Sequence, residues 1–204
     1  MIKLEHVSKA YSAGIPALND VSLHIKEGEF VFVVGESGSG KSTFIRLLLK
    51  ELEPTSGKIF INGQEINRLK RKQIPKLRRN IGVVFQDFRL LRDRNVYENV
   101  AFAQRVIGTS TKTIRSRVPQ MLSMVGLAAK YKSLPRQLSG GEQQRVSIAR
   151  ALSKKPRIIL GDEPTGALDS ETGVIVLQLL QKRSKENQDT VILVTHNADI
   201  AKCA

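Results

Sequence analysis

The sequence predicts an α/β fold with a mostly parallel sheet, an antiparallel β subdomain at its edge and a helical subdomain. Three observations lead to this prediction. Short apolar runs typical of strands alternate with stretches of helical periodicity, which favours parallel strands joined by helices. Two segments near the N-terminus alternate apolar and polar residues, as half-buried antiparallel strands do. Between about residues 87 and 155 the patterns are helical.

The first half of the chain supplies the antiparallel segments and the first buried strand. The antiparallel segments are "IKLEHVSKAY" at 2–11 and "VSLHI" at 21–25. The continuous apolar run "FVFVV" at 30–34 is expected to be a strand buried on both faces, and "STFIRLLLKEL" at 42–52 has helical periodicity. Two further strands are expected at 58–63 and 81–86.

The second half is expected to be helical before it returns to strands. Helices are predicted at Val96–Ile107 and Thr113–Val125, and Pro119 is expected to interrupt the second because proline removes a backbone donor. The remaining predicted elements are a helix at 140–155, a strand at 157–161, a helix at 171–187 and a strand at 190–196. The chain, 1–204, is predicted to be one domain, with a helical subdomain of about 87–155 inserted in the α/β core.

Composition excludes several classes of protein. An apolar fraction of 41% suits a globular core and argues against disorder, and no apolar run approaches the roughly 20 residues of a spanning helix. Cys203 is the only cysteine, so an internal disulfide is excluded and a reducing cytoplasm is the expected compartment. The net charge of +14 indicates an anionic partner: a nucleotide, a nucleic acid or an anionic membrane surface.

The densest group of basic residues is "RLKRKQIPKLRR", Arg68–Arg79. One interpretation is the solvated face of a helix. The other is contact with lipid headgroups, to which each basic side chain near the surface contributes about 1 kcal/mol. Charge alone does not distinguish the two.

The segment "GESGSGKS", Gly35–Ser42, fits the pattern G-x-x-x-x-G-K-[ST] between a buried strand and a helix. In this P-loop setting, successive backbone N–H groups and the helix N-terminus form an anion-binding nest, which glycines leave open to a phosphate. Lys41 is expected to reach the β- and γ-phosphates, and Ser42 to bind Mg²⁺. The predicted ligands are therefore ATP and Mg²⁺, and the nucleotide-binding residues here are Gly35, Glu36, Ser37, Gly38, Ser39, Gly40, Lys41, Ser42 and Thr43.

A second motif, "RIILGDEP" at 157–164, is an apolar strand that ends in two carboxylates. Because side chains alternate along a strand, Asp162 and Glu163 are expected to point in different directions. One can then hold the Mg²⁺ shell while the other faces an attacking water. Asp162 suits the metal role and Glu163 the role of general base.

A third motif, "LSGGEQQR" at 138–145, places Ser139, Gly140 and Gly141 at a helix start and makes a second anion-binding site. A serine N-cap alone explains the serine but not the paired glycines. Since the P-loop already cradles the nucleotide, we expect one ATP to be shared between the P-loop of one copy and Ser139–Gly141 of another. This predicts an ATP-dependent homodimer.

The motifs "GESGSGKS", "LSGGEQQR", "GDEPTGALD" and "VTHN", in this order, resemble those of the ATP-binding subunits of ABC transporters. The resemblance covers essentially the whole chain and implies an ATPase. It implies that Tyr11 stacks on adenine and that Gln86 senses Mg²⁺ and couples to a membrane subunit. It further implies that Asp169 touches the opposite subunit and that His196 contacts the γ-phosphate. Gly161 stands where the family usually has alanine, a change expected to have no consequence.

A narrower resemblance lies in "LRRNIGVVFQDFRLL", which looks like the FtsE family of bacterial cell-division ATPases. This implies an FtsX-like integral membrane subunit as partner and a peripheral position at the cytoplasmic face of the bacterial inner membrane, in contact with anionic lipid. The LolD and MacB export ATPases have similar motifs, so an export role is the alternative. ABC ATPases that act on nucleic acid or ribosomes usually have paired cassettes or a long coiled-coil insertion. This chain has neither, so nucleic acid is not expected as a partner.

Overall fold

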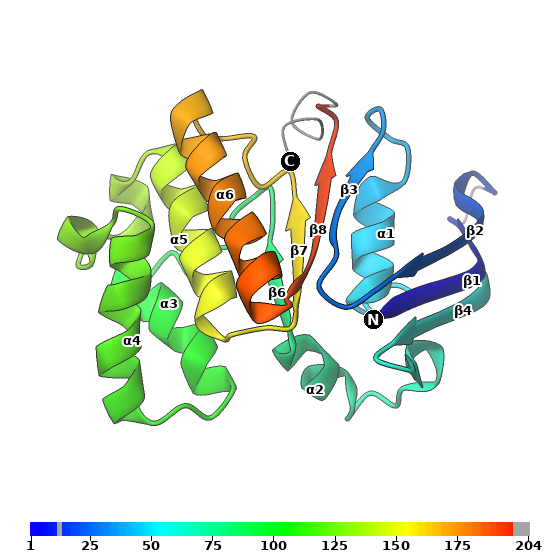
Figure 1. The fold of residues 1–204 in the computed structure, drawn as a ribbon, viewed down its shortest axis with the longest axis horizontal. Coiled ribbons are helices and arrows are strands. Elements are labelled where there is room, and N and C mark those ends of the chain that lie inside the picture. The colour runs from blue at the N-terminus through cyan, green and yellow to red at the C-terminus, as the bar shows by residue number, and fades with distance from the viewer. Residues whose placement is uncertain (12–13, 198–204) are drawn as a thin grey trace.

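The computed structural model describes residues 1–11 and 14–197, so the argument from Cys203 lies outside the described residues. Its centre is a four-stranded sheet in the order β3-β8-β7-β6, in which every neighbouring pair is parallel (Figure 1). The strands are Phe30–Val34 (β3), Thr190–Thr195 (β8), Ile158–Asp162 (β7) and Ile81–Val84 (β6). Their continuous apolar sequences fit a sheet that is covered on both faces.

The antiparallel strands form a four-stranded sheet of their own, in the order β2-β1-β4-β5. Ile2 of β1 lies opposite Ile25 of β2 and Ile61 of β4, and all three side chains are buried. The apolar–polar alternation therefore places one face of this sheet against the core. The strands are Ile2–Ala10 (β1), Pro16–Ile25 (β2), Ser56–Ile61 (β4) and Gln64–Glu65 (β5).

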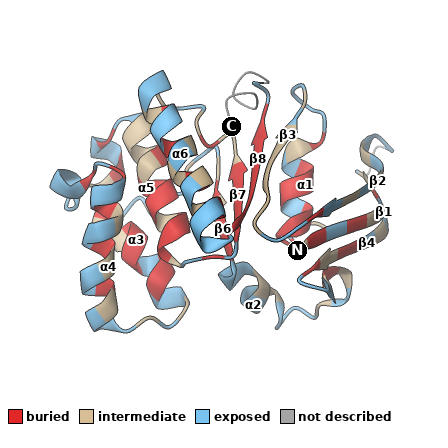
Figure 2. Ribbon diagram, in the orientation of Figure 1, coloured by how far each residue is buried: buried red, intermediate tan, exposed pale blue. Residues whose placement is uncertain are grey.

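The two faces of the parallel sheet belong to two apolar cores, and successive residues of β8 alternate between them. Val191 and Leu193 pack with the helices that follow β6, whereas Ile192 and Val194 pack with α1 and the antiparallel sheet. All four side chains are essentially inaccessible, in agreement with the buried central strands of Figure 2. Because side chains alternate along β8, the helical region packs on one face of the parallel sheet and the antiparallel region on the other.

The described elements between β6 and β7 are helical. They are Val96–Val106 (α3), Thr111–Met124 (α4) and Gly140–Ser153 (α5), with 3₁₀ turns at Ala128–Lys130 and Pro135–Gln137. Helix α1 (Lys41–Leu48) follows β3 and α6 (Ser170–Asn187) follows β7. Before β6 lie the short helix α2 (Ile74–Arg79) and a 3₁₀ turn at Ile66–Arg68.

The expected interruption at Pro119 is wrong, because α4 runs unbroken through this residue. Its buried side chains Ile114, Val118 and Leu122 recur at helical spacing and pack into the core. Pro119 itself is exposed, so water can hydrate the carbonyl that loses its donor. Tertiary packing therefore outweighs the local cost of the proline.

The carboxyl ends of the parallel strands meet at the upper edge of the sheet in Figure 1. The segments that leave this edge carry the predicted site: the P-loop after β3, Gln86 after β6, Glu163 after β7 and His196 after β8. In open α/β sheets, ligands bind outside this edge. Among the described residues, no helix is both long and apolar enough to cross a membrane.

Candidate active site

The P-loop connects β3 to α1 through two glycines in the left-handed region. Gly40, the N-cap of α1, has φ of 91°, and a Cβ there would lie 2.0 Å from the carbonyl oxygen of Ala17. Gly38 has φ of 82°, and a Cβ there would meet no atom within 4 Å. Gly40 is thus required by close packing, whereas Gly38 leaves open space beside the backbone.

Lys41, the first residue of α1, folds back over the loop. Its Nζ donates to the carbonyl oxygens of Gly35 and Glu36, both at 2.6 Å, and lies 3.5 Å from the hydroxyl of Ser39. Gly35, Glu36 and Ser39 therefore support the lysine from the side of the loop. The ammonium of Lys41 thus ties the end of the P-loop to its beginning.

Asp162 and Ser42 come together because of strand parity. Asp162 shares a face of β7 with Ile158 and Leu160, which pack toward α1. The hydroxyl of Ser42, at the start of α1, donates to Oδ1 of Asp162 over 3.4 Å. Burial raises the pKa of Asp162, with the nearby Glu163 charge acting in the same direction and the Ser42 hydrogen bond opposing it.

Glu163 does not obey the alternation that the sequence suggested. The strand ends at Asp162, and Glu163 has φ of 50°, in the left-handed region. Its Oε1 accepts a hydrogen bond from the backbone N–H of His196 at 2.9 Å and lies 2.7 Å from Nδ1 of that ring. As a result, Asp162 and Glu163 line the same cavity.

This cavity, of about 590 Å³, brings together most of the predicted site residues. Tyr11 closes one side, and its hydroxyl lies 3.0 Å from that of Thr43. Ile15, Pro16 and Ala17, around the start of β2, also line the cavity, and no sequence pattern had pointed to them. The predicted residues that line it are Tyr11, Ser37, Gly38, Gly40, Lys41, Ser42, Thr43, Gln86, Asp162, Glu163 and His196.

Ser139–Gly141 and Asp169 are not among the residues that line this cavity. Ser139 caps α5, since its hydroxyl accepts from the N–H of Glu142 while its own N–H donates to that carboxylate. Figure 1 shows α5 and α1 on opposite sides of β7 and β8. Asp169 caps α6 and lines an adjoining cavity of about 450 Å³ that shares Glu163 and His196.

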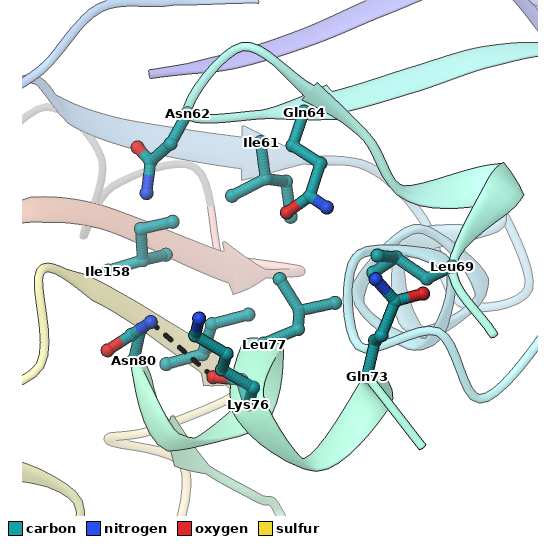
Figure 3. Close-up of a pocket in the computed structure, with 10 residues that line it drawn as sticks. Ile61, Asn62, Gln64, Leu69, Gln73, Lys76, Leu77, Asn80 and Ile158 are labelled. Carbon is teal, nitrogen blue, oxygen red and sulfur yellow. Dashed lines mark hydrogen bonds between the residues drawn. The ribbon is translucent and has the colours of Figure 1, made fainter. Parts of the chain in front are cut away.

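Another cavity, of about 180 Å³, lies away from these residues, between α2 and the β4–β5 hairpin. Figure 3 shows the amide side chains of Asn62 and Gln64 on one side of it and Lys76 and Asn80 on the other. The amide of Asn80 donates to the carbonyl of Lys76 over 3.4 Å. None of the predicted site residues lines this cavity, so it is not part of the candidate site.

The model of the ABC transporter family matches residues 18–166, which include the P-loop and both carboxylates. The chain belongs to the ABC transporter family. Similarity to solved ABC cassettes extends over the whole fold. A dimeric post-hydrolysis structure of the ATP-binding cassette MJ0796, bound to ADP and Pi, aligns with a TM-score of 0.94 at 43% identity, over 99% of this chain and 90% of that one. The predicted P-loop NTPase fold and ABC-type ATPase are confirmed.

Similar proteins within the ABC family share the name of one cell-division protein. The cell division ATP-binding protein FtsE of Mycobacterium tuberculosis is 51% identical over 201 residues, which cover 98% of this chain and 87% of the relative. The protein of the same name from Bacillus subtilis is 50% identical over 200 residues, with the same coverage. The predicted resemblance to FtsE is confirmed, and the chain falls among the ABC ATPases of cell division.

Proposed function

We propose that this ABC ATPase binds ATP·Mg²⁺ in the cavity of about 590 Å³ and couples hydrolysis to a membrane subunit of the FtsX type. The phosphates would lie against the P-loop, where the space beside Gly38 is open. Tyr11, 42% exposed at the cavity wall, would stack on adenine. Thr43, hydrogen-bonded to Tyr11, would hold the ring in this position.

The oxygen donors of the cavity fit Mg²⁺, which prefers hard oxygen ligands. Ser42 and Asp162 already lie within hydrogen-bonding distance of one another, and the amide of Gln86 lines the same space. These three residues would hold the ion, directly or through water. Mg²⁺ bound there would neutralise charge on the β- and γ-phosphates.

Glu163 would act as the general base and His196 would contact the γ-phosphate. The carboxylate of Glu163 is only 12% exposed and is held by His196, so its oxygens have a fixed position at the cavity edge. A positioned carboxylate can accept the proton of an attacking water. The ring of His196 is 68% exposed, which leaves it accessible to a ligand.

We further propose that a second copy of the chain completes the ATP-binding site. Within the described residues, the N–H groups of Gly140 and Gly141 have no acceptor, because they belong to the unpaired first turn of α5. Free N–H groups at an exposed helix N-terminus bind anions. Asp169 lines, together with Glu163 and His196, the cavity that adjoins the nucleotide site, where it would meet the other copy.

The membrane subunit would dock in a groove of about 350 Å³ between the end of α1, helix α2 and helices α3 and α5. Its apolar wall includes Leu91 and the exposed side chains of Phe102 and Val106. Phe85 also lines it, one residue before Gln86, so the groove adjoins the segment that reaches the nucleotide cavity. An amphipathic helix laid into such a groove would meet apolar anchors along one face.

The groove also carries excess positive charge, from Arg78, Arg89, Arg150 and Lys154 against Glu51. Arg150 donates to the carbonyls of Phe88 and Arg89, at 2.6 and 2.5 Å, and so holds the segment after Gln86 against α5. Burial lowers the pKa of Arg150 to about 10 and that of Lys154 to about 8. An acidic residue in the docked segment would compensate these cations.

The basic segment at 68–79 would face anionic lipid at the cytoplasmic surface of the inner membrane. Arg78 is not available for this role, because it donates to the carbonyls of Leu49 and Lys50. Its helix, α2, forms one wall of the proposed docking groove, so the remaining cations lie beside the membrane partner. Arg78 apart, the exposed cations of this segment without an ion-pair partner among the described residues are Lys70, Arg71, Lys72, Lys76 and Arg79.

The observation that carries the proposal is the convergence of Lys41, Ser42, Asp162, Glu163 and His196 on one cavity. Replacing Lys41 by alanine removes charge-assisted bonds to phosphate worth about 1.5 to 3 kcal/mol each. Calorimetry should then show ATP binding weakened by about 10- to 100-fold, with turnover lost. Lys58→Ala, on the exposed face of β4, is the matched control. An unchanged ATP affinity in Lys41→Ala would refute the assignment.

A further inference from the structure

Gln144 connects the start of helix α5 to the loop that carries Glu163. Its side chain is fully buried, with 1% of its surface exposed, and its Nε2 donates to the carbonyl oxygen of Pro164 at 2.9 Å. Its Oε1 has no hydrogen-bond partner among the described residues. Burial of an amide oxygen without a hydrogen-bond partner costs free energy. Gln144 makes its hydrogen bond to Pro164 in spite of this cost.

The loop that receives this bond needs support. Glu163 lies in the left-handed region, which is unfavourable for a non-glycine residue because Cβ crowds the following carbonyl oxygen. Its N–H donates to Val194 at 2.9 Å, and its carbonyl accepts from Gly166 at 3.1 Å. Pro164 is buried, so its carbonyl depends on a protein donor. Gln144 supplies that donor and fixes the peptide directly after Glu163.

The same face of α5 carries the glycines of the proposed second anion site. Gly140 and Gly141 precede Gln144 by four and three residues, which places the three on one side of the helix. A Cβ on Gly141 would lie 3.3 Å from the carbonyl of Ala167, in the loop after Pro164. The first turn of α5 therefore packs directly on this loop, backbone against backbone.

We propose that Gln144 is a positioning residue for Glu163, through which the N-terminus of α5 sets the place of the general base. This rests on the proposed role of Glu163 and on the shared nucleotide. ATP from the other copy, bound at Gly140 and Gly141, would contact the N-terminus of α5. Because Gln144 bonds this helix to the loop of Glu163 in its own chain, a shift of the helix would also move Glu163.

Two substitutions test the hydrogen bond itself. Gln144→Met keeps the length of the side chain but removes the donor, and misplacement of the base should lower kcat by about 10²-fold while ATP affinity is retained. Gln144→Glu lacks a donor when ionised but regains one when protonated, and burial raises the pKa of such a carboxyl. The kcat of Gln144→Glu relative to the unaltered chain should therefore rise as the pH falls from 8 to 6, whereas that of Gln144→Met should stay flat.

Equal, pH-independent ratios for the two variants, or an unchanged kcat in Gln144→Met, would overturn the inference. Circular dichroism at both pH values shows whether each variant is folded, and the Met variant carries the test if the Glu variant is not. Light scattering on Glu163→Gln with Gln144→Met and ATP should still detect a dimer. Loss of that dimer would mean that Gln144 acts on the dimer surface and not on Glu163. Normal turnover in Glu163→Gln alone would instead refute the proposed base.

Discussion

Oε1 of Glu163 holds His196 by two contacts, one to its backbone N–H at 2.9 Å and one to Nδ1 of its ring at 2.7 Å. With the carboxylate ionised, Nδ1 must carry the proton, so the contact selects one tautomer of the neutral ring. The carboxylate and the histidine that would contact the γ-phosphate are thus one structural unit, although 33 residues separate them in sequence.

The first prediction concerns this pair. His196→Ala removes the ring donor that orients Glu163, and kcat should fall by about 10²-fold. Asparagine offers an amide donor of similar reach, so His196→Asn should recover part of the loss. Steady-state ATPase assays compare the two variants. Equal activity in both, at the level of the unaltered chain, would show that the contact plays no part in turnover.

The second prediction concerns the docking groove. Leu91→Glu or Phe102→Glu replaces an apolar contact surface by a hydrated carboxylate, which also competes with the partner for the cations of the groove. Either variant should abolish co-purification with the FtsX-like membrane subunit, with ATP binding intact. Ile175→Glu, on an exposed apolar position of α6 that lines neither the groove nor the cavity of Asp169, is the control for charge on another surface. If Ile175→Glu disrupts the complex and the groove variants do not, the partner docks elsewhere.

The third prediction concerns lipid. Arg71→Gln with Lys72→Gln should weaken binding to anionic vesicles by about 2 kcal/mol, or roughly 30-fold, at low salt. The difference should shrink as salt screens the charges. Lys132→Gln with Arg136→Gln removes the same charge from exposed positions near the start of α5. Equal sedimentation of both double variants with vesicles would mean that the basic segment at 68–79 faces solvent and does not bind lipid.

The fourth prediction concerns Gly161, whose replacement by alanine the family resemblance treats as harmless. A Cβ there would lie 2.8 Å from Cδ2 of Leu193 and 3.0 Å from Cγ of Pro164. Gly161→Ala should therefore destabilise the fold by about 1 to 3 kcal/mol in urea unfolding. Gly173→Ala, where the nearest atom would lie 3.8 Å away, should not destabilise it. A Gly161→Ala midpoint as high as that of the unaltered chain would contradict the observed packing.

The sequence predicted those parts of the site that depend on neighbouring residues. The P-loop needs a buried strand, glycines and a helix start in immediate succession, so Lys41 and Ser42 could be placed from local pattern alone. Asp162 could be placed at the carboxyl end of a strand from the apolar run that precedes it. The longer helices were found from their periodicity, and the parallel strands from continuous apolar runs.

Contacts between distant segments could not be predicted in this way. The left-handed backbone of Glu163 depends on Val194, and the bond from Gln144 to Pro164 spans 20 residues. Pro119 is tolerated only because its helix packs on the core through its other face. In each case tertiary packing decides between local conformations that the sequence leaves open.

In the proposed mechanism, ATP is shared between the P-loop of one copy and Ser139–Gly141 of another. Glu163→Gln should lower hydrolysis by about 10² to 10⁴-fold without removing a phosphate contact. Light scattering with ATP·Mg²⁺ should then detect a dimer of this variant, and adding Ser139→Arg should return it to monomers that still bind ATP. A Glu163→Gln protein that binds ATP and stays monomeric at saturation would contradict the claim.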